Sequence, residues 1–366
     1  MKKLAIFFRN GSRPVPRAIR MMKTAEELGY KSIFCGAFRN VSDTKESYLD
    51  GFQIIRVGKL YPLLNGKKIL TYMYYTFFFC VSLYKYFKKT KPSLLVASDF
   101  EVMIPAIIYS KMYNIRLIYN IHDNLAERYN LPSFIRYILN IIEGAAAILS
   151  ESAMVPEIFR KTSLPMWCQH KIHIVKNTPG DISFSKPPPF DEKIKLFYGG
   201  WLNWGRGIKE LINIAESNPN IDIRIAGSGS DDIISFIEKH NSVTYLGHIS
   251  HKQSIIETQN AHFIPSFYNP STIINRYAAS NKLAEAMAVG RPLLINSEME
   301  IIKSFKDRNS YLSYNYENIS NIGADLFQLM NEKNKYLEMC KESRLIFEEQ
   351  YTWNVAKKKM IELIKE

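Results

Sequence analysis

One stretch, SNKLAEAMAVGRP at residues 280–292, decides more about the fold than any other part of the chain. It predicts a loop, a short helix, a glycine stop and then a buried strand at residues 293–296. Lys282 lies at the start of this helix and Glu285 one turn later, so both side chains project from the same face of the helix. A lysine at the start of a helix favours the binding of a phosphate group, and a carboxylate beside it can accept hydrogen bonds from the two hydroxyl groups of a ribose. The stretch therefore predicts a nucleotide-diphosphate site, with an ordinary amphipathic helix bearing an ion pair as the alternative.

Strands and helices alternate outward from this stretch over the whole chain. The alternation predicts an α/β fold of parallel sheets with crossover helices. The predicted strands lie at residues 4–8, 32–35, 52–56, 94–97, 117–121, 147–149, 172–175, 195–198, 221–226, 243–246, 262–265 and 292–295. The predicted helices lie at residues 14–29, 69–88, 101–113, 132–143, 207–216, 233–240, 252–259 and 281–289.

Prolines and glycines crowd the segment TPGDISFSKPPP at residues 178–189, which predicts a linker. We expect two doubly wound, Rossmann-like domains, at 1–178 and 193–350, with the linker at 179–192. Residues 351–366 are expected to form a helix that crosses back to the first domain. In doubly wound sheets, ligands bind beyond the carboxyl ends of the strands, so we expect the two domains to face a cleft.

The composition excludes several kinds of protein. The 366 residues are 46% hydrophobic and 23% charged, as in globular proteins with well-packed cores. The four cysteines are scattered without a CxxC pair, which argues against zinc and disulfides and suits the cytosol. The first ten residues predict a strand, not a signal peptide. No Asp-x-Asp pair occurs, so we expect no metal, and no Walker, HExxH or GxSxG motif occurs.

The positive charge is concentrated in the first half of the chain. Residues 1–178 hold 26 Lys and Arg against 12 Asp and Glu, a net +14, so the total of +13 leaves −1 for the remainder. Such a surface attracts nucleic acid, anionic lipid or a phosphorylated substrate, although a basic surface also serves solubility. No aromatic–basic RNA motif accompanies it, so nucleic acid is the least favoured partner.

Residues 69–84, ILTYMYYTFFFCVSLY, are uncharged and flanked by lysines. A helix of this length spans about 24 Å, short of the roughly 30 Å hydrocarbon core of a bilayer. Tyrosines and flanking lysines are typical of interfacial helices. We expect a helix whose apolar face meets either the bilayer surface or its own core.

Two turns of the second domain are candidate ligand sites. The turn YGGWLNWGRG, residues 198–207, brings Gly200, where a ligand can approach the backbone, and Arg206, which can fork onto phosphate oxygens. Tight strand-to-helix turns also use glycine for geometry alone. A later strand ends in Gly247, His248 and Ile249, whose backbone groups are placed to bind a flat base.

The first domain offers weaker candidates. His122 follows a predicted strand, where a neutral imidazole can bind a sugar hydroxyl, although a lone histidine is more often a core or capping residue. Asp123 beside it is equally a candidate N-cap. Gly11, Ser12 and Arg13 follow the first strand and are expected to open the first helix, a place for an anion.

Four segments of the second half, YGGWLNWGRG, IAGSG, YLGHI and SNKLAEAMAVGRP, resemble the retaining glycosyltransferases of family four in order and spacing. The segment KIHIVKNT at 171–178 resembles the strand before their linker, and the helix after Tyr351 resembles their last helix. The first half matches mainly through its opening strand and residues 121–123. The resemblance implies the GT-B fold and the transfer of a sugar from a nucleotide diphosphate, with the anomeric configuration retained.

The resemblance also implies roles for individual residues. Arg206 and Lys282 would clamp the diphosphate, Glu285 the ribose, and His122 would touch the donor sugar. The donor site is then expected to comprise Gly200, Arg206, Gly247, His248, Ile249, Asn281, Lys282 and Glu285. Two positions depart from the family pattern: Tyr277 stands where a second glutamate is common, and Trp201 where an arginine often follows the glycine. Asn275, Arg276 and Ser280 are candidate substitutes.

The leading functional prediction is a retaining, metal-independent glycosyltransferase that uses a UDP- or GDP-sugar and no cofactor. Its expected acceptor is a lipid-linked glycan of lipopolysaccharide, O-antigen or capsule synthesis, and its expected place is the cytoplasmic face of the cell membrane. One alternative is a GT-B epimerase or a transferase for soluble acceptors, and another is a non-catalytic sugar-nucleotide-binding protein.

Overall fold

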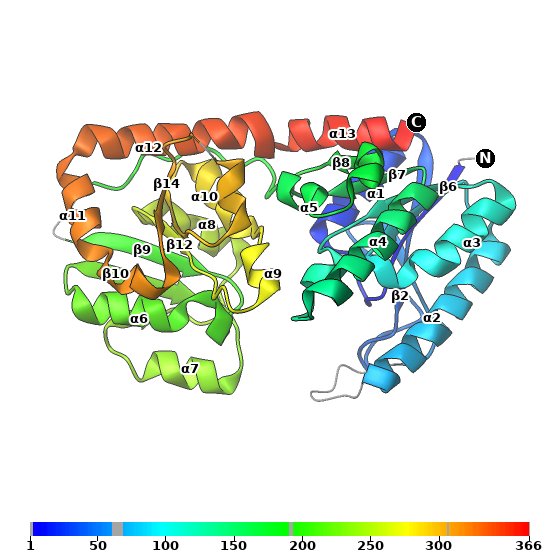
Figure 1. The fold of residues 1–366 in the computed structure, drawn as a ribbon, viewed down its shortest axis with the longest axis horizontal. Coiled ribbons are helices and arrows are strands. Elements are labelled where there is room, and N and C mark those ends of the chain that lie inside the picture. The colour runs from blue at the N-terminus through cyan, green and yellow to red at the C-terminus, as the bar shows by residue number, and fades with distance from the viewer. Residues whose placement is uncertain (1–2, 61–68, 190–192, 306, 366) are drawn as a thin grey trace. The chain divides into compact units, whose positions relative to one another are not determined.

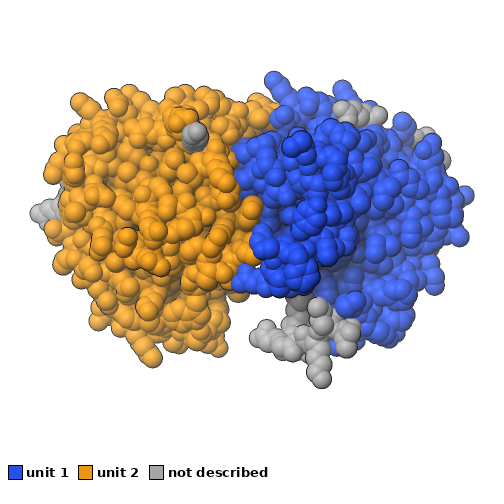
Figure 2. Space-filling model, viewed as in Figure 1, with its two compact units in different colours: residues 1–176, 356–366 blue, residues 177–355 orange. Residues whose placement is uncertain are grey.

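The computed structural model describes residues 3–60, 69–189, 193–305 and 307–365. They form two compact units, Met1–Lys176 with Ala356–Glu366, and Asn177–Val355, which are coloured separately in Figure 2. Both units alternate strands and helices around parallel sheets, so the predicted α/β fold class is confirmed (Figure 1).

The first unit is built on an eight-stranded sheet in the order β3-β4-β2-β1-β5-β6-β7-β8. Every strand pair is parallel except β3 with β4. Its strands are β1 (Lys3–Arg9), β2 (Tyr30–Ala37), β3 (Glu46–Leu49), β4 (Phe52–Val57), β5 (Leu94–Ser98), β6 (Arg116–Asn120), β7 (Ser152–Val155) and β8 (Ile172–Ile174). Its helices are α1 (Pro16–Glu27), α2 (Ile69–Thr90), α3 (Met103–Tyr113), α4 (Ser133–Leu149) and α5 (Ile158–Thr162), with 3-10 turns η1 (Phe100–Val102), η2 (Leu125–Glu127) and η3 (Met166–Lys171).

The second unit joins two three-stranded parallel sheets, β11-β10-β9 and β12-β13-β14, through a bridge between Leu196 and Phe263. Its strands are β9 (Ile194–Gly199), β10 (Ile221–Ala226), β11 (Val243–Tyr245), β12 (Ile264–Ser266), β13 (Leu293–Asn296) and β14 (Tyr311–Tyr314). Its helices are α6 (Ile208–Ser217), α7 (Asp231–Glu238), α8 (His251–Asn260), α9 (Ile273–Arg276), α10 (Asn281–Val289), α11 (Gly323–Asn331) and α12 (Lys333–Ile346), with shorter turns η4 (Trp204–Arg206), η5 (Glu300–Ser304), η6 (Tyr316–Asn321) and η7 (Phe347–Tyr351).

The last helix, α13 (Trp353–Lys365), belongs from Ala356 onward to the first unit. Arg116 of β6 donates hydrogen bonds to the carbonyls of Leu363 (3.2 Å) and Ile364 (2.6 Å), which are otherwise unused at the helix end. Lys357 pairs with Glu27 of α1 at 2.7 Å. The chain end therefore packs on the first unit, as the sequence predicts.

Helix α10 begins and ends as its sequence predicts. Ser280 is the N-cap and its hydroxyl accepts from the Lys282 N–H at 3.2 Å. Gly290 ends the helix at φ +75°, a left-handed conformation that glycine adopts without strain. The buried strand β13 follows directly after this glycine stop.

One predicted strand is wrong. Residues 147–149 form the last turn of α4, and the strand is β7, which begins at Ser152. A short apolar run fits a buried helix turn as well as a strand, and here three alanines favour the helix. The antiparallel edge strand β3 and the last strand β14 were not predicted.

Helix α2 has one buried face and one exposed face, and both carry apolar side chains. Phe79, Leu83 and Phe87 are buried in the core of the first unit, whereas Met73 (59% exposed) and Phe77 (62% exposed) face outward. No helix in the described ranges is long and apolar enough to cross a membrane.

Candidate functional site

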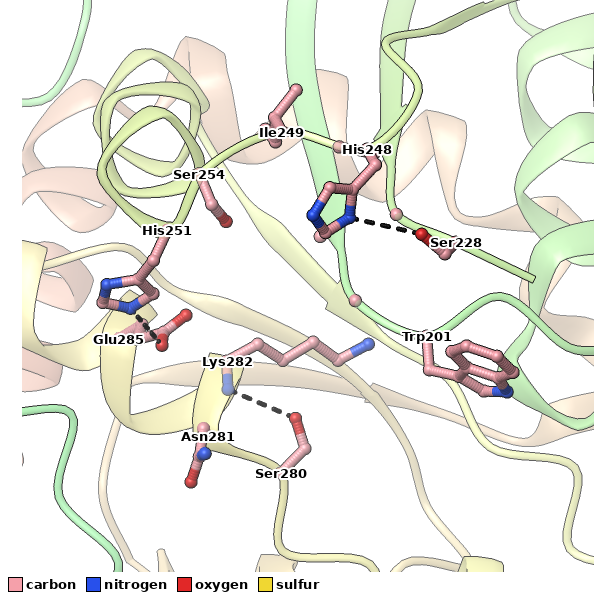
Figure 3. A pocket seen from close by; sticks show the side chains of 14 residues that line it. Trp201, Ser228, His248, Ile249, His251, Ser254, Ser280, Asn281, Lys282 and Glu285 are labelled. Atoms are coloured by element: carbon pink, nitrogen blue, oxygen red, sulfur yellow. Dashed lines mark hydrogen bonds and ion pairs between the residues drawn. The ribbon is translucent and has the colours of Figure 1, made fainter. Parts of the chain in front are cut away.

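A cavity of 550 Å³ lies in the second unit, beyond the carboxyl ends of β9 and β10 and beside the start of α10 (Figure 3). Six of the eight predicted donor-site residues line it, and two, Arg206 and Gly247, do not. Its lining consists of Gly199, Gly200, Trp201, Ala226, Gly227, Ser228, His248, Ile249, His251, Ser254, Ser280, Asn281, Lys282 and Glu285.

Lys282 is the most unusual group in the cavity. Its ammonium lies 3.8 Å from the centre of the Tyr198 ring and 5.4 Å from that of Tyr268, both cation–π distances. Within the described residues no hydrogen-bond acceptor reaches its buried Nζ atom. Burial and then the nearby Arg206 guanidinium hold the pKa of Lys282 well below its usual value. An ammonium in this position lacks an anionic partner that a ligand can supply.

Arg206 reaches the same place from another element. It is the last residue of η4, directly before Gly207, which is the N-cap of α6. Its guanidinium carbon lies 4.4 Å from the centre of the Tyr268 ring, so Tyr268 is shared by both cations. The two predicted phosphate-binding residues are therefore close together, although Arg206 is not part of the cavity lining itself.

The floor of the cavity needs glycine. Gly227 has φ +144°, and a Cβ there would lie 1.7 Å from the carbonyl oxygen of Gly200. The Gly227 N–H donates to the carbonyl of Gly247 at 2.9 Å, so Gly247 positions the floor without lining it. The turns after β9, β10 and β11 are thereby held together, and their backbone is open to a ligand.

Glu285 and two histidines also line the cavity. Glu285 Oε1 lies 2.9 Å from His251 Nε2, and the side chains are 14% and 64% exposed. His248 Nδ1 lies 3.2 Å from the Ser228 hydroxyl. The carboxylate that the sequence assigns to a ribose is thus already paired, with a partner that is mostly in solvent (Figure 3).

Of the two positions that depart from the family pattern, one lines the cavity and the other does not. Trp201 is 62% exposed and lines the cavity. Tyr277 is the C-cap of α9 and is not in the lining. Asn275 donates to the carbonyls of Gly205 and Asn269, and Arg276 to that of Pro270, so these two brace loops. Of the candidate substitutes, only Ser280 borders the cavity.

His122 lies in the first unit, after β6. The amide nitrogen of Asn120 is 3.0 Å from His122 Nε2, where an amide N–H donates to an unprotonated ring nitrogen. Loss of water around the half-buried ring lowers the pKa of His122 to about 4, although the Asp99 carboxylate acts in the opposite direction. The imidazole is therefore neutral at physiological pH, as its predicted role requires. Asp123 is not an N-cap; its carboxylate pairs with Arg160 at 2.8 Å.

The expectation that Gly11, Ser12 and Arg13 open the first helix is wrong. Helix α1 begins at Pro16 with Val15 as its N-cap, so the tripeptide lies outside the first turn. The carbonyls of Gly11 and Ser12 instead accept hydrogen bonds from Ala37 N–H and Arg56 Nε, both at 3.0 Å. These two hydrogen bonds hold the loop against β2 and β4.

The sequence did not predict several residues of the site: Tyr198 and Tyr268, which face the cations, His251 and Ser228, which pair with predicted residues, and Ser254, which lines the cavity. Tyr198 is shared by the predicted strand at 195–198 and the glycine turn, and neither pattern indicates a contact with a cation. Nothing in the pattern around Tyr268 points to a ligand. In the described part of the chain, no group of three His, Cys, Asp or Glu side chains is placed to hold a metal ion.

Comparison with known proteins agrees with this architecture. No protein-family model matches the chain. Among curated proteins, the glycogen synthase of Mycobacterium tuberculosis is 23% identical over 228 residues, which are 57% of this chain and 52% of that protein. The chain thus matches about half the length of that relative.

Solved structures match over nearly the whole chain. Sucrose-phosphate synthase from Thermosynechococcus elongatus has a TM-score of 0.79 at 13% identity, covering 100% of this chain and 98% of its own. The fold is GT-B. The lipopolysaccharide outer core galactosyltransferase WaaB, in its apo form, has a TM-score of 0.70 at 14% identity over 99% of both chains. Anabaena HepE in complex with UDP-glucose has a TM-score of 0.68 at 11% identity, again over 99% of both.

Proposed function

We propose that the protein is a glycosyltransferase that moves a sugar from a nucleotide diphosphate to an acceptor. The observation that carries the proposal is the pair of cations on Tyr268, with the Lys282 ammonium buried and without a hydrogen-bond acceptor among the described residues. A diphosphate supplies both the charge and the acceptor oxygens that this pair lacks. The structural neighbours, one of them bound to UDP-glucose, support the same donor class.

The chemistry follows from where charge develops. As the bond between sugar and phosphate breaks, the leaving diphosphate gains negative charge, which Arg206, Lys282 and the N-terminal turn of α10 would stabilise without rearranging. A leaving phosphate oxygen can take the proton of the acceptor hydroxyl while the acceptor oxygen bonds to the anomeric carbon on the face that the phosphate has just left, which retains the anomeric configuration. In this proposal the two cations take the place of a metal ion, and no cofactor is needed. Glu285 would exchange His251 for the ribose hydroxyls.

The finer parts of the proposal rest on the first unit. Its basic charge and the outward apolar side chains of α2 favour a lipid-linked acceptor, and hence a peripheral enzyme of surface polysaccharide synthesis on the inner face of the membrane. The contact of His122 with the donor sugar stays a prediction. Transfer to a soluble acceptor, or epimerisation, is the alternative if the protein ignores membranes.

A non-catalytic sugar-nucleotide-binding protein is a second candidate. It is favoured by Tyr277, which stands where the family commonly has a second carboxylate and does not reach the cavity. Such a protein would bind the donor but neither transfer nor hydrolyse it.

Thermal unfolding with UDP, GDP, ADP and their sugar conjugates, followed by assays of donor hydrolysis and transfer, tests the proposal. A cognate nucleotide at a hundred times its Kd stabilises the fold by about 2.7 kcal/mol. Lys282→Ala should lower turnover by about 10²–10³-fold. The matched control is Lys252→Ala, an exposed lysine of α8. No stabilisation by any nucleotide, or turnover of Lys282→Ala equal to that of the wild type, contradicts the proposal; binding without turnover selects the second candidate.

A further inference from the structure

A second cavity, of 1120 Å³, runs along α2 in the first unit. It is bounded by α2, α3, the η2 turn and the start of α4, and its walls are almost entirely apolar. Phe77 and Val81 of α2, Ile104 and Ile108 of α3, and Tyr129 and Ile135 from the η2–α4 segment line it. We call this cavity the α2 groove. Its size exceeds that of sites for drug-sized ligands, which are about 300–1,000 Å³.

The α2 groove is one part of a wider apolar face. Ile104 is 62% exposed, and on α4 Phe134 and Tyr137 are each 67% exposed. The opposite sides of the same three helices are buried in the core, through Phe87, Tyr109 and Ala147 among others. The core is therefore complete without the outward side chains. An exposed apolar area that spans three helices marks an interaction site.

The charges on these helices select the partner. Helix α2 carries Lys85, Lys88 and Lys89, α3 carries Lys111 and α4 carries Arg136. The only acidic residue of the three helices, Glu143, is fully buried. Helices that expose apolar and cationic side chains but no carboxylate complement a partner that is apolar and anionic.

The two ends of the α2 groove differ. At one end Lys85 and Lys88 line it, and both are exposed. At the other end Glu101 lines it, with its carboxylate paired to Arg128 at 2.7 Å, so it repels an anion less than a free carboxylate would. The positions from Tyr72 to Lys88 on α2 span about 24 Å. The shape is that of an elongated apolar channel with cations at one mouth.

We propose that the α2 groove binds the hydrocarbon chain of an anionic membrane lipid, with the lipid phosphate at Lys85 and Lys88. One buried chain holds a protein to a bilayer only marginally, whereas a chain together with a basic patch gives stable binding. The first unit offers both. This inference deepens the proposed function, because it names the class of lipid that would bind the first unit. It rests on that function only for the use of such a lipid in transfer.

Sedimentation with vesicles of phosphatidylcholine alone, and of phosphatidylcholine and phosphatidylglycerol in equal parts, tests the proposal. The wild type should pellet with the anionic vesicles and less so at high salt, because salt screens the lysines. Ile104→Asp combined with Ile108→Asp should weaken that binding at least tenfold. Ile104 is 62% and Ile108 47% exposed, and neither belongs to the buried core, so the fold should survive the change. Met166→Asp, at an 86% exposed apolar residue outside the groove, is the matched control and should bind as the wild type does.

The lysines are tested separately. Lys85→Gln with Lys88→Gln should weaken binding to anionic vesicles by about fivefold per lysine and leave binding to neutral vesicles unchanged. Lys23→Gln with Lys31→Gln, at exposed lysines of α1 and β2, is the control for net charge. An equal loss in both pairs would show that net charge alone acts and would overturn the site.

Other outcomes are also decisive. A wild type that stays in the supernatant with both vesicles, or an Ile104/Ile108 variant that still pellets, overturns the proposal. So does a wild-type dimer that this variant disperses, since the face would then join two copies of the chain. Nucleotide stabilisation of the same variants separates the two proposals: vesicle binding without any nucleotide effect would remove the transferase and leave the lipid site standing.

Discussion

The two units place charged side chains near the carboxyl ends of their parallel strands, but they neutralise them differently. In the first unit Arg9 pairs with Asp99 at 2.9 Å, and Arg128 pairs with Asp99 and Glu101 at 2.8 and 2.7 Å. Burial alone would raise the pKa of Asp99, but His122, Arg128 and Arg9 outweigh it and hold that pKa below its usual value. Each of these four charged side chains therefore has a partner of opposite charge within the first unit.

In the second unit the corresponding cations have no such partners. Arg206 and Lys282 face tyrosine rings, and among the described residues no carboxylate forms an ion pair with either. A ring face attracts a cation more weakly than a carboxylate does and leaves its N–H groups free. The comparison teaches that charge density alone does not mark a site. What marks it is charge that the fold has buried and left without a counter-ion.

The comparison predicts its largest effect at Arg128. Arg128→Ala leaves Glu101 without its ion-pair partner and Asp99 with Arg9 alone, in a mostly buried place, which should cost about 3–5 kcal/mol of the free energy of unfolding of the first unit. Hydrogen exchange of β5 and β6 amides measures this unit by itself. Lys111→Ala, at an exposed lysine of α3, should change it by less than about 0.5 kcal/mol. A loss below 1 kcal/mol in Arg128→Ala would mean that the network is not what stabilises this edge.

Lys282 should respond in the opposite direction. Lys282→Met keeps the length of the side chain but removes a buried ammonium, so the second unit should become more stable by about 1–2 kcal/mol while nucleotide binding is lost. Hydrogen exchange of β9 and β13 amides reports this change. Lys252→Met, on the exposed face of α8, serves as the neutral reference. If Lys282→Met destabilises the unit, the lysine has a structural partner and the contrast fails.

Donor binding should also take up protons. The pKa of Lys282 is lowered by burial and by Arg206, and an anionic diphosphate would raise it again. Above the lowered pKa the free lysine is neutral and must gain a proton to bind, so the affinity should fall as pH rises, by at most about tenfold per pH unit. Calorimetry in buffers of different ionisation enthalpy counts these protons, and a UDP-sugar avoids titration of the ligand. A pH-independent affinity, or a slope that persists in Lys282→Met, would contradict this assignment.

The smallest effect concerns two helix caps. Ser280 caps α10 at the cavity and Ser250 caps α8, each accepting one backbone N–H at 3.2 Å. Either serine-to-alanine change should cost about 1 kcal/mol of stability. Only Ser280→Ala should also weaken nucleotide binding, because it loosens the turn that meets the phosphate. Equal nucleotide affinities in the two variants would show that the start of α10 is not part of the donor site.

Much of the second unit was predictable because its signals are local. The N-cap serine, the helix of small and apolar residues and the glycine stop define α10 within eleven residues. The helix period then places Lys282 and Glu285 on one face whatever surrounds them. The prediction that Gly11 to Arg13 open the first helix was wrong for a related reason. The start of a helix depends on where its first turn closes, and the prolines at 14 and 16 moved that point to Pro16.

What the sequence could not determine was each side chain's distant neighbour. Tyr268 lies more than ten residues from Lys282 and sixty from Arg206, and only the parallel packing of β9, β12 and β13 brings it beneath both cations. The His251–Glu285 pair joins α8 to α10 in the same way. For residues 69–84 the sequence offered a membrane face or a core face, and the structure shows that α2 has an inward and an outward apolar side.

By itself, then, the sequence determined the alternation of strands and helices, the caps and glycine turns, and the helix start that carries Lys282, because each follows from backbone conformation within a few residues. The tertiary structure alone decided which charges are neutralised and which are left without a counter-ion. Burial and ion pairing depend on residues that meet only after the sheets have formed. It is this second decision that separates the stabilising network of the first unit from the candidate site of the second.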